Sequence, residues 1–503
     1  MNTLSLIDYL VIALYLGGIL TLGFSFTKRQ KSCKDYFIAD KRIPGWAMGI
    51  ALLATLVSNM TFLANPGVAF NGDWRQFFNS FMALIVIFPI ALIVIPLYRN
   101  IVGMSLYEFF ETRFGSPVRV YGAVAFIFYY LARMSVIFYV LALAINTMTG
   151  WPLYCLILII GMVTILFTFL GGMEAVMWTD VVQGILLISG GIICLGIALF
   201  SAPGGPLNVI KVAAEAQKFQ LGEMSWSLRS DTLLVMALYG LYQHFHNFGT
   251  DQTQVQRYLT AKSTKQATRG ALISGIACVP VWALFFFVGT SIWGYYHLTG
   301  TELPPEIMAK PDRIFPYFIM NQLPVGVVGL VLAALISSAI STLSSGLNSG
   351  ATVFTNDILM KIKPQLSDRS GLKSARIVVV LTGFISMSIA AWLSTLGGDA
   401  LVIYFTAFSI FGGGILGLFF LAFLSKKANY KGALVGIVAT LLVITWASLT
   451  KNDIIDLGRW NYDLHPYLIG LIGHLTVFIV GWISSFFLHD PKNEKKYIHP
   501  LSA

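Results

Sequence analysis

Long apolar stretches, separated by short polar ones, run from one end of the chain to the other. A helix needs about 20 apolar residues to cross the hydrocarbon core of a bilayer. The pattern predicts thirteen such spans, near residues 5–25, 46–70, 77–98, 120–147, 151–170, 177–200, 232–256, 272–297, 317–355, 375–395, 399–424, 432–449 and 463–488. We therefore expect an all-α polytopic membrane protein with thirteen transmembrane helices.

The amino-acid composition agrees with this expectation. Hydrophobic residues make up 56% of the 503-residue chain and charged residues only 11%, whereas soluble domains carry about 25% charged residues. The segments between the predicted spans are too short to form a soluble catalytic or sensor domain. A membrane receptor with an output domain is therefore excluded.

Lys and Arg are distributed unequally between the two sides of the predicted bundle. If the N-terminus lies outside, the cytoplasmic segments hold 24 of the 33 Lys and Arg residues, Arg257 among them, and the outer segments hold eight. Because cytoplasmic loops of membrane proteins are enriched in these residues, we expect a multi-pass protein of the cell membrane with the C-terminus in the cytoplasm. The net charge of +10 then indicates contact with anionic membrane lipid, and no nucleic-acid partner.

Polar residues interrupt two of the predicted spans. One interruption is ATLVSNMTFLANPG at residues 54–67, and the other is LYGLYQHFHNFGTDQ at residues 238–252. Non-helical backbone is tolerated at membrane depth where it lines a cavity. A pair of broken helices at matching positions is typical of an inverted-repeat transporter with its substrate at the midplane. Either interruption alone is also compatible with an ordinary Pro or Gly kink.

The two interrupted spans stand five spans apart, and because five is odd the second unit enters the membrane from the opposite side. We therefore expect two inverted five-helix repeats. The chain divides into residues 1–45 (an extra helix and a basic cytoplasmic loop), 46–231 (the first repeat and an outer loop), 232–425 (the second repeat) and 426–503 (two C-terminal helices and a cytoplasmic tail).

Hydroxyl side chains gather in the segment SSAISTLSSGLNSG at residues 337–350. Spacing of three and four residues places six polar side chains on one helix face: Ser338, Ser341, Thr342, Ser345, Asn348 and Ser349. One or two such serines commonly pack or bond back to a carbonyl, but a continuous oxygen-rich face suits a monovalent cation such as Na⁺. Ca²⁺ would require carboxylates, which this segment lacks.

Asp180 is a carboxylate inside a predicted span, where an acid needs a partner or a function. If Asp180 faces the serines, it completes a second cation site. The alternative is an interfacial acid that caps its helix near the N-terminus.

Arg133 lies near the middle of a span, where a charge costs at least about 2.5 kcal/mol. The guanidinium fork matches a carboxylate, so we expect an anionic substrate; a structural ion pair with an Asp or Glu is the alternative. A hydroxyl-rich sugar acid also needs polar contacts, for which Ser58, Thr61, Asn79, Ser80 and Asn247 are candidates, with Phe248 as an aromatic lid.

Four segments carry a resemblance to a known family: DYFIADKRIPGWAMGIALLAT, GGMEAVMWTDVVQG, GTDQTQVQRYL and STLSSGLNSGATVFTNDIL, spread over residues 35–360. The chain resembles members of the sodium:solute symporter family, which includes sodium-driven sugar, proline, pantothenate and sialic acid transporters. The resemblance implies the fold first seen in a bacterial leucine transporter, with thirteen helices and the N-terminus outside.

The resemblance also implies which residues bind sodium. The common site of the family would use the backbone carbonyls of Ala54 and Val57 with Ser338, Ser341 and Thr342. The second site of some members would use Asp180 with Ser341, Ser344 and Ser345. We therefore expect two coupling Na⁺ ions in each cycle.

Within the family, the chain is most similar to bacterial sialic acid transporters, in which an arginine at the position of Arg133 binds the carboxylate of the sugar acid. Ser58 and Thr61 stand at matching positions of the first broken helix. The chain departs where that subgroup can have a glutamine, because it carries FFNSF with Asn79 and Ser80 there. The resemblance implies sodium-coupled uptake of sialic acid; a neutral sugar or another small carboxylate is the alternative.

Two other classes of protein fit the sequence less well. A channel could use the broken helices and clustered oxygens, but the sequence has no repeated filter segment. An enzyme is disfavoured because the chain carries neither a zinc-protease nor a phosphate-loop motif.

Overall fold

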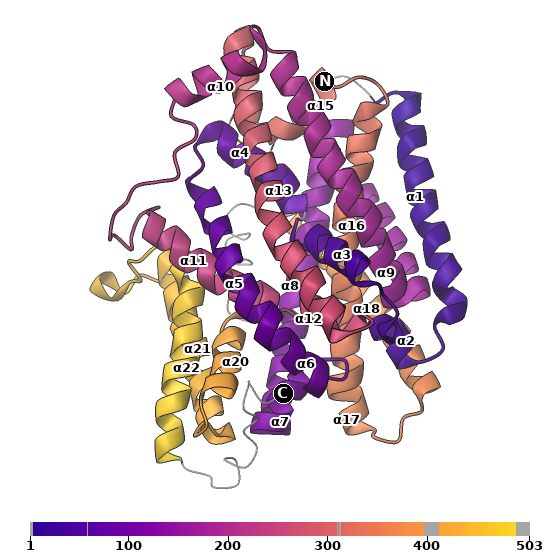
Figure 1. Cartoon of the computed structure of the whole chain (residues 1–503), viewed down its shortest axis with the longest axis vertical. Helices are drawn as coiled ribbons and strands as arrows, with labels where there is room; N and C mark the ends of the chain where they lie inside the picture. Colours follow the sequence, from indigo (N-terminus) through magenta and orange to yellow (C-terminus); the bar gives the residue numbers. More distant parts are fainter. Residues whose placement is uncertain (1–3, 58, 309, 311–312, 397–411, 489–503) are drawn as a thin grey trace.

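The computed structural model describes residues 4–57, 59–308, 310, 313–396 and 412–488. Within these residues the regular structure is helical, and the only strand-like pairings are two isolated bridges, Ile43 with Ala261 and Glu223 with Thr232. Most helices run roughly along the long axis of the molecule (Figure 1). The prediction of an all-α protein is confirmed.

The α-helices are α1 (Leu6–Phe26), α2 (Cys33–Ile38), α3 (Gly45–Leu56), α4 (Asn59–Asn71), α5 (Met82–Pro89), α6 (Ile95–Ile101), α7 (Tyr107–Phe114), α8 (Ser116–Thr149), α9 (Leu153–Phe200), α10 (Gly205–Glu215), α11 (Leu233–Phe245), α12 (Gln252–Thr260), α13 (Thr264–Thr299), α14 (Pro305–Met308), α15 (Ile314–Gln322), α16 (Val327–Val353), α17 (Met360–Ile362), α18 (Asp368–Leu393), α20 (Ile415–Leu424), α21 (Tyr430–Lys451) and α22 (Leu468–Phe487). Short 3₁₀ turns are η1 (Thr27–Arg29), η2 (Ala39–Lys41), η3 (Arg75–Phe81) and η8 (Gly458–Trp460); π-turns are η4 (Ile90–Val94), η5 (His246–Thr250) and η7 (Phe354–Leu359).

Nine helical segments among the described residues are long and apolar enough to cross a membrane, and the bent pair α3–α4 makes a tenth if it is one span. The helix α9 covers two of the predicted spans, 151–170 and 177–200, because the backbone breaks only at Gly172 (φ 56°, ψ −160°). Half of the predicted span 399–424 lies outside the described residues, which resume at residue 412, before α20. Several membrane-spanning helices are confirmed, and the count of thirteen stays a prediction.

Both predicted interruptions are present as breaks in the helices. The helix α3 ends where Val57 takes a non-helical conformation (φ −93°, ψ 76°), and α4 continues at 49° to it. The helix α11 passes into the π-turn η5, after which Asp251 is extended (φ −80°, ψ 117°) and caps α12. Each break leaves backbone groups without their usual intrahelical partners.

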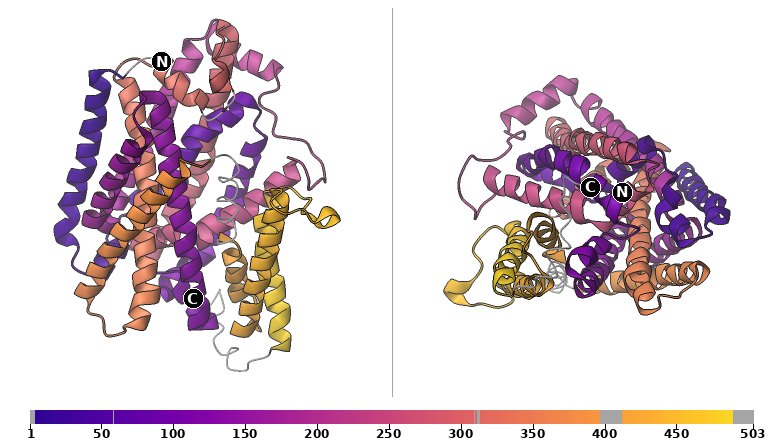
Figure 2. Two further views of the ribbon diagram at one scale, coloured as in Figure 1. Left: turned by 180° about the vertical axis from the view of Figure 1, so that it is seen from behind. Right: turned by 60° about the horizontal axis from the view of Figure 1, so that its bottom comes forward.

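The helix α16 lies in the interior of the bundle, and nearly all of its residues are buried. It packs against α9, α1, α8 and α18, and the two views of Figure 2 place it among them. The broken pair α3–α4 packs on α13, where Gly270 and Gly289 allow the backbones to approach closely. The hydroxyl segment is therefore held inside the protein, away from lipid.

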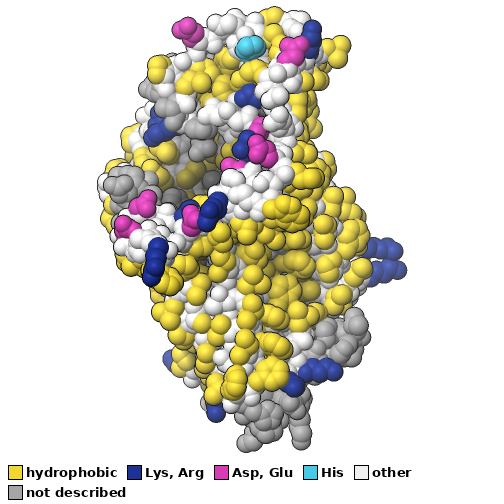
Figure 3. Space-filling model, turned by 90° about the vertical axis from the view of Figure 1, so that its left-hand side faces the viewer, with side chains coloured by type: hydrophobic (Ala, Val, Ile, Leu, Met, Phe, Trp, Pro, Cys, Tyr) yellow, Lys and Arg dark blue, Asp and Glu magenta, His cyan; other side chains and the backbone are white. Residues whose placement is uncertain are grey.

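The surface separates by side-chain type. On the face shown in Figure 3, apolar side chains cover much of the middle of the molecule. Asp and Glu are visible only in the upper half of this view, whereas Lys and Arg are visible towards both ends. This distribution is typical of a protein whose middle faces lipid.

Candidate functional site

The hydroxyl face of α16 is buried along its length. Thr342 Oγ1 donates to the carbonyl of Ser338 (3.1 Å), and Ser345 Oγ donates to the carbonyl of Ser341 (2.7 Å). Ser344 Oγ also donates to the Ser341 carbonyl (3.1 Å). Because these hydroxyl protons are used inside the helix, the oxygen lone pairs remain available as acceptors.

Ser338 differs from these neighbours. Its side chain is only 4% exposed, and among the described residues its Oγ has no hydrogen-bond partner. A buried hydroxyl without a partner costs about 1–3 kcal/mol. An unsatisfied oxygen on this face therefore favours a ligand that the protein itself does not provide.

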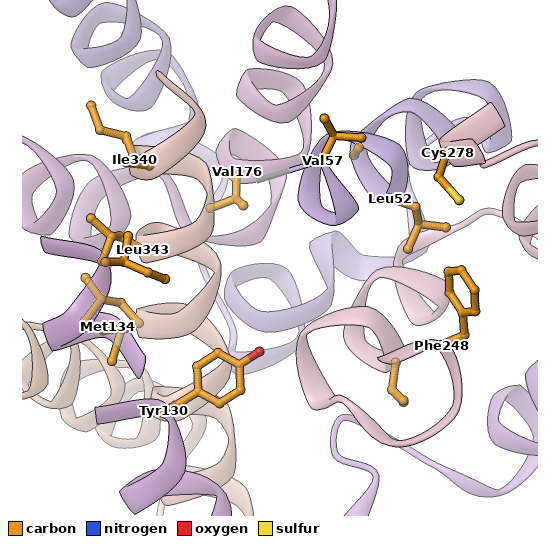
Figure 4. Packing of buried hydrophobic residues seen from close by; sticks show 14 of the residues in the cluster. Leu52, Val57, Tyr130, Met134, Val176, Phe248, Cys278, Ile340 and Leu343 are labelled. Atoms are coloured by element: carbon orange, nitrogen blue, oxygen red, sulfur yellow. The ribbon is translucent and has the colours of Figure 1, made fainter. Parts of the chain in front are cut away.

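The end of α3 meets this face. Thr55 and Leu56 of α3 line the same cavity as Thr342 and Ser345 of α16. The last carbonyls of a helix lack intrahelical partners, so oxygens from the turn that contains Ala54 and Val57 and oxygens from α16 are available near one cavity. Side chains of the surrounding elements are drawn in Figure 4, where Val57 lies across from Ile340 and Leu343 of α16. The end of α3 and the hydroxyl face of α16 thus border one cavity. Of the five residues predicted for the first sodium site only Thr342 lines it, and this site stays a prediction.

Asp180 faces the serines, as one of the two sequence hypotheses required. Ser341 Oγ donates to Asp180 Oδ1 (2.5 Å), and the carboxylate has no exposed surface. The alternative of an interfacial capping acid is wrong, because Asp180 lies within α9 and is fully buried.

Arg257 is the partner of Asp180 that the sequence analysis missed. Its Nη2 donates to Asp180 Oδ2 (2.7 Å) and to Ser345 Oγ (2.5 Å), and its side chain is fully buried. The sequence analysis counted Arg257 in a loop between two spans, but α12 packs against α16, α3 and α13 and its Arg257 side chain is fully buried. Its guanidinium occupies part of the predicted second sodium site.

A small polar cavity of about 70 Å³ lies between the two broken helices, α8, α13 and α16. Its lining residues are Thr55, Leu56, Tyr130, Arg133, Asn247, Asp251, Thr253, Gln254, Trp282, Thr342 and Ser345. This volume holds a few water molecules and is too small for a nine-carbon sugar acid. Binding such a molecule requires the surrounding helices to move apart.

Arg133 lines this cavity and keeps 32% of its side-chain surface exposed. Its guanidinium lies 3.4 Å from Asp251 Oδ2 and 5.5 Å from the ring of Tyr130. The ion pair that the sequence analysis raised as an alternative is thus present. The sequence analysis did not name Tyr130 of α8, nor Asp251, Thr253 and Gln254 of the second broken helix, as cavity residues. It did predict a break in the polar run that contains Asp251.

The remaining predicted substrate residues lie in different places. Asn247 lines the cavity and accepts a hydrogen bond from Gln243 Nε2 (3.3 Å). Thr61 and Ser80 are buried, and Asn79 Nδ2 donates to the carbonyl of Gln76, but none of the three lines the cavity. Phe248 is buried against His244, with ring centroids 5.8 Å apart, and also does not line it. Ser58 lies outside the described residues.

A bundle with two broken helices, a buried hydroxyl helix and a polar central cavity defines a membrane transporter. Residues 36–440 match the model of the Sodium:solute symporter family, and the chain belongs to this family. It is 32% identical to the Sodium/sialic acid symporter NanT of Aliivibrio fischeri over 99% of this chain and 96% of that protein. It is also 32% identical to the Sodium/sialic acid symporter SiaT of Proteus mirabilis over 95% of each chain.

A solved structure gives the same result for the fold. It is that of a sodium-coupled sialic acid symporter in a substrate-bound, outward-open state, and it superposes with a TM-score of 0.88 at 31% identity. The likeness covers 96% of this chain and 98% of the other. The helical arrangement therefore extends over nearly the whole of both proteins.

Proposed function

We propose that the chain is a secondary active symporter that couples inward Na⁺ flux to uptake of sialic acid by alternating access. The observation that carries the proposal is the position of Arg133, a guanidinium that lines a polar cavity between two broken helices. Transporter sites lie at such breaks, and two relatives that are 32% identical to this chain are sodium/sialic acid symporters.

Arg133 would bind the substrate carboxylate through its bidentate fork. Asn247 is placed to contact the hydroxyl or acyl groups, since it lines the same cavity. We propose that Ser58, Thr61, Asn79 and Ser80 contribute further polar contacts when the cavity widens, and that Phe248 closes over the sugar. A neutral sugar or another small carboxylate is the second candidate; a neutral sugar would leave the charge of Arg133 without a substrate partner.

The first Na⁺ would be bound by the carbonyls of Ala54 and Val57 with Ser338, Ser341 and Thr342. The unpartnered oxygen of Ser338 supports this assignment. A sodium ion at this position would join the first broken helix to α16 and so favour one state of the bundle.

The second Na⁺ would be bound by Asp180, Ser341, Ser344 and Ser345. The carboxylate and the serines lie together, as this site requires. Because the guanidinium of Arg257 now contacts Asp180 and Ser345, a second ion would have to displace it. We propose that two Na⁺ ions accompany one substrate.

We further propose thirteen transmembrane helices arranged as two inverted five-helix repeats, with the N-terminus outside and the C-terminus in the cytoplasm. The larger number of Lys and Arg residues in the segments assigned to the cytoplasm, 24 against eight, supports this orientation. The repeats would comprise residues 46–231 and 232–425, flanked by residues 1–45 and 426–503.

The test is uptake of labelled N-acetylneuraminic acid into proteoliposomes, with and without an inward Na⁺ gradient. We expect uptake by the native protein only with Na⁺, a loss of at least about tenfold in Arg133→Ala, and normal uptake in Arg459→Ala. Arg459 is a matched control because it lies in an exposed turn. Absence of uptake by the native protein would exclude sialic acid, and inhibition of uptake by excess glucose would favour a neutral sugar.

A further inference from the structure

Asp251 is a carboxylate that already occupies the position where a substrate carboxylate would meet Arg133. Both residues line the central cavity, and Asp251 Oδ2 lies 3.4 Å from Arg133 Nη1. Charge-assisted N–H···O hydrogen bonds are normally about 2.7–2.9 Å long. The guanidinium is thus paired with an internal acid over a contact longer than a normal charge-assisted hydrogen bond.

The other partners of Asp251 are closer. Thr253 donates to Asp251 Oδ1 from its backbone nitrogen (2.8 Å) and from its hydroxyl (2.7 Å). The Tyr130 hydroxyl lies 2.8 and 2.9 Å from the two carboxylate oxygens. Asp251 therefore keeps its shorter hydrogen bonds when Arg133 turns to another partner.

Arg133, in contrast, gains from an exchange of partners. An incoming carboxylate can accept two parallel hydrogen bonds from the fork, whereas Asp251 supplies one long contact. A neutral ligand cannot replace the negative charge, so it would have to bind with Arg133 still paired to Asp251. Only a ligand that carries a carboxylate therefore competes with Asp251 for the guanidinium.

We propose that Asp251 is a specificity-determining residue that competes with the substrate carboxylate for Arg133. This inference rests on the proposed role of Arg133 in binding a carboxylate. Asp251 lowers the apparent affinity for a ligand that carries a carboxylate, because this ligand must displace Asp251 from Arg133. A neutral ligand leaves the pair in place and is not affected by the competition. A site that is partly occupied by an internal competitor binds ligand more weakly in proportion to the fraction that is free.

The test is equilibrium binding of N-acetylneuraminic acid and of its uncharged methyl ester to purified protein in saturating Na⁺. Asp251→Asn keeps the size of the side chain and an oxygen that caps α12, but removes the charge. We expect this variant to bind the acid about five- to tenfold more tightly than the native protein, with a change of less than about twofold for the ester. Asp251→Ser, which retains a capping oxygen, is the second variant if Asp251→Asn does not fold.

Two further variants of the protein control for effects that do not involve the pairing of Asp251 with Arg133. Asp73→Asn is a matched control, because Asp73 pairs with Arg75 (2.9 Å) outside the cavity lining, and it should bind both ligands like the native protein. The double variant Arg133→Ala/Asp251→Asn should show no gain over Arg133→Ala, because the competition needs the arginine.

The outcomes separate this inference from the proposed function. If Arg133→Ala weakens binding of the acid but Asp251→Asn leaves it unchanged or weaker, Asp251 positions Arg133 instead of competing for it, and the inference is wrong. If Arg133→Ala has no effect on the acid, the proposed carboxylate contact itself fails. An equal gain for acid and ester would also overturn the inference, since it would reflect a general change in the cavity.

Discussion

Asp180 on α9 and Arg257 on α12 form an ion pair of 2.7 Å in which neither side chain has exposed surface. The pair joins a helix of the first predicted repeat to a broken helix of the second. Ser341 and Ser345 of α16 complete its hydrogen bonds. One network of charges and hydroxyls therefore connects three elements that surround the candidate site.

Removal of one member of this pair should be more harmful than removal of both. We expect Arg257→Met to lower the free energy of unfolding by about 3–5 kcal/mol, because it leaves Asp180 buried and unpaired. The double variant Asp180→Asn/Arg257→Met should recover a large part of this loss. Denaturant unfolding in detergent micelles measures both effects. Equal stability of Arg257→Met and the native protein would mean that the pair is dispensable.

Ser338 provides a test of the first sodium site. We expect Ser338→Ala to raise the Na⁺ concentration for half-maximal uptake by about tenfold, since one ligand oxygen is worth roughly 1–1.5 kcal/mol. Ser386→Ala is the matched control, because Ser386 is also buried with an unpartnered Oγ among the described residues but lies on α18. A similar shift in both variants would argue against sodium binding at Ser338.

The proposed stoichiometry predicts a voltage effect. Two Na⁺ ions and one carboxylate carry one net positive charge inward, and a charge gains about 2.3 kcal/mol per 100 mV. An inside-negative potential of about 60 mV should therefore raise the accumulation ratio of sialic acid about tenfold. A potassium diffusion potential in proteoliposomes makes the measurement. Accumulation that ignores the potential would indicate one Na⁺ per substrate.

Two side chains of α1, Asp8 and Tyr15, form hydrogen bonds with α16 and the glycine that precedes it. Asp8 Oδ1 accepts hydrogen bonds from the backbone nitrogens of Gly326 and Gly329, both 2.8 Å, at the start of α16. Further along, the Tyr15 hydroxyl donates to Ser337, the residue before Ser338. The extra N-terminal helix thus contacts the element that carries the candidate sodium ligands.

Loss of the Asp8 contact should affect both stability and coupling. We expect Asp8→Ala to destabilise the protein by about 1–3 kcal/mol, because the buried backbone donor of Gly329 and the partly buried donor of Gly326 lose their acceptor. We also expect it to raise the Na⁺ requirement of uptake. Glu215→Ala, which changes an exposed acid on α10, should alter stability by less than about 0.5 kcal/mol. An Asp8→Ala protein as stable as the control would show that α1 is held by apolar packing alone.

The sequence predicted the features that depend on local spacing. The three- and four-residue repeat of hydroxyls from Ser338 to Ser349 was enough to predict one buried helix face. The polar runs in residues 54–67 and 238–252 were enough to predict the two breaks. Such patterns are read within one helix, where periodicity fixes which side chains share a face.

Features that depend on packing between distant segments could not be predicted in this way. Arg257 follows a predicted span, so charge counting placed it at the surface; the break at Asp251 turns α12 inward and buries it. The contact of Arg133 with Asp251 joins residues 118 positions apart. The two predicted spans that form α9 differ from a plain helix only at Gly172, whose positive φ of 56° is not visible in a hydropathy pattern.

Gly289 on α13 provides a test of how tightly the first broken helix is held. A Cβ atom at this position would lie 2.1 Å from the carbonyl oxygen of Pro66 in α4. The atoms in conflict with this Cβ belong to the backbone of Pro66, which cannot change rotamer as a side chain can. Gly289→Ala must therefore push α4 and α13 apart. We expect a destabilisation of about 1–3 kcal/mol and a loss of uptake, because α4 belongs to the broken helix beside the site.

Gly196→Ala on α9 is the control for this substitution, since a Cβ there meets nothing within 4 Å. In a helix interior this change should be neutral or stabilising by up to about 1 kcal/mol. Thermal unfolding and Na⁺-driven uptake of the two variants, measured side by side, separate a steric effect from a general effect of replacing glycine. If Gly289→Ala kept native stability and uptake, α4 would have room to move against α13, and the contact at Pro66 would not constrain the broken helix.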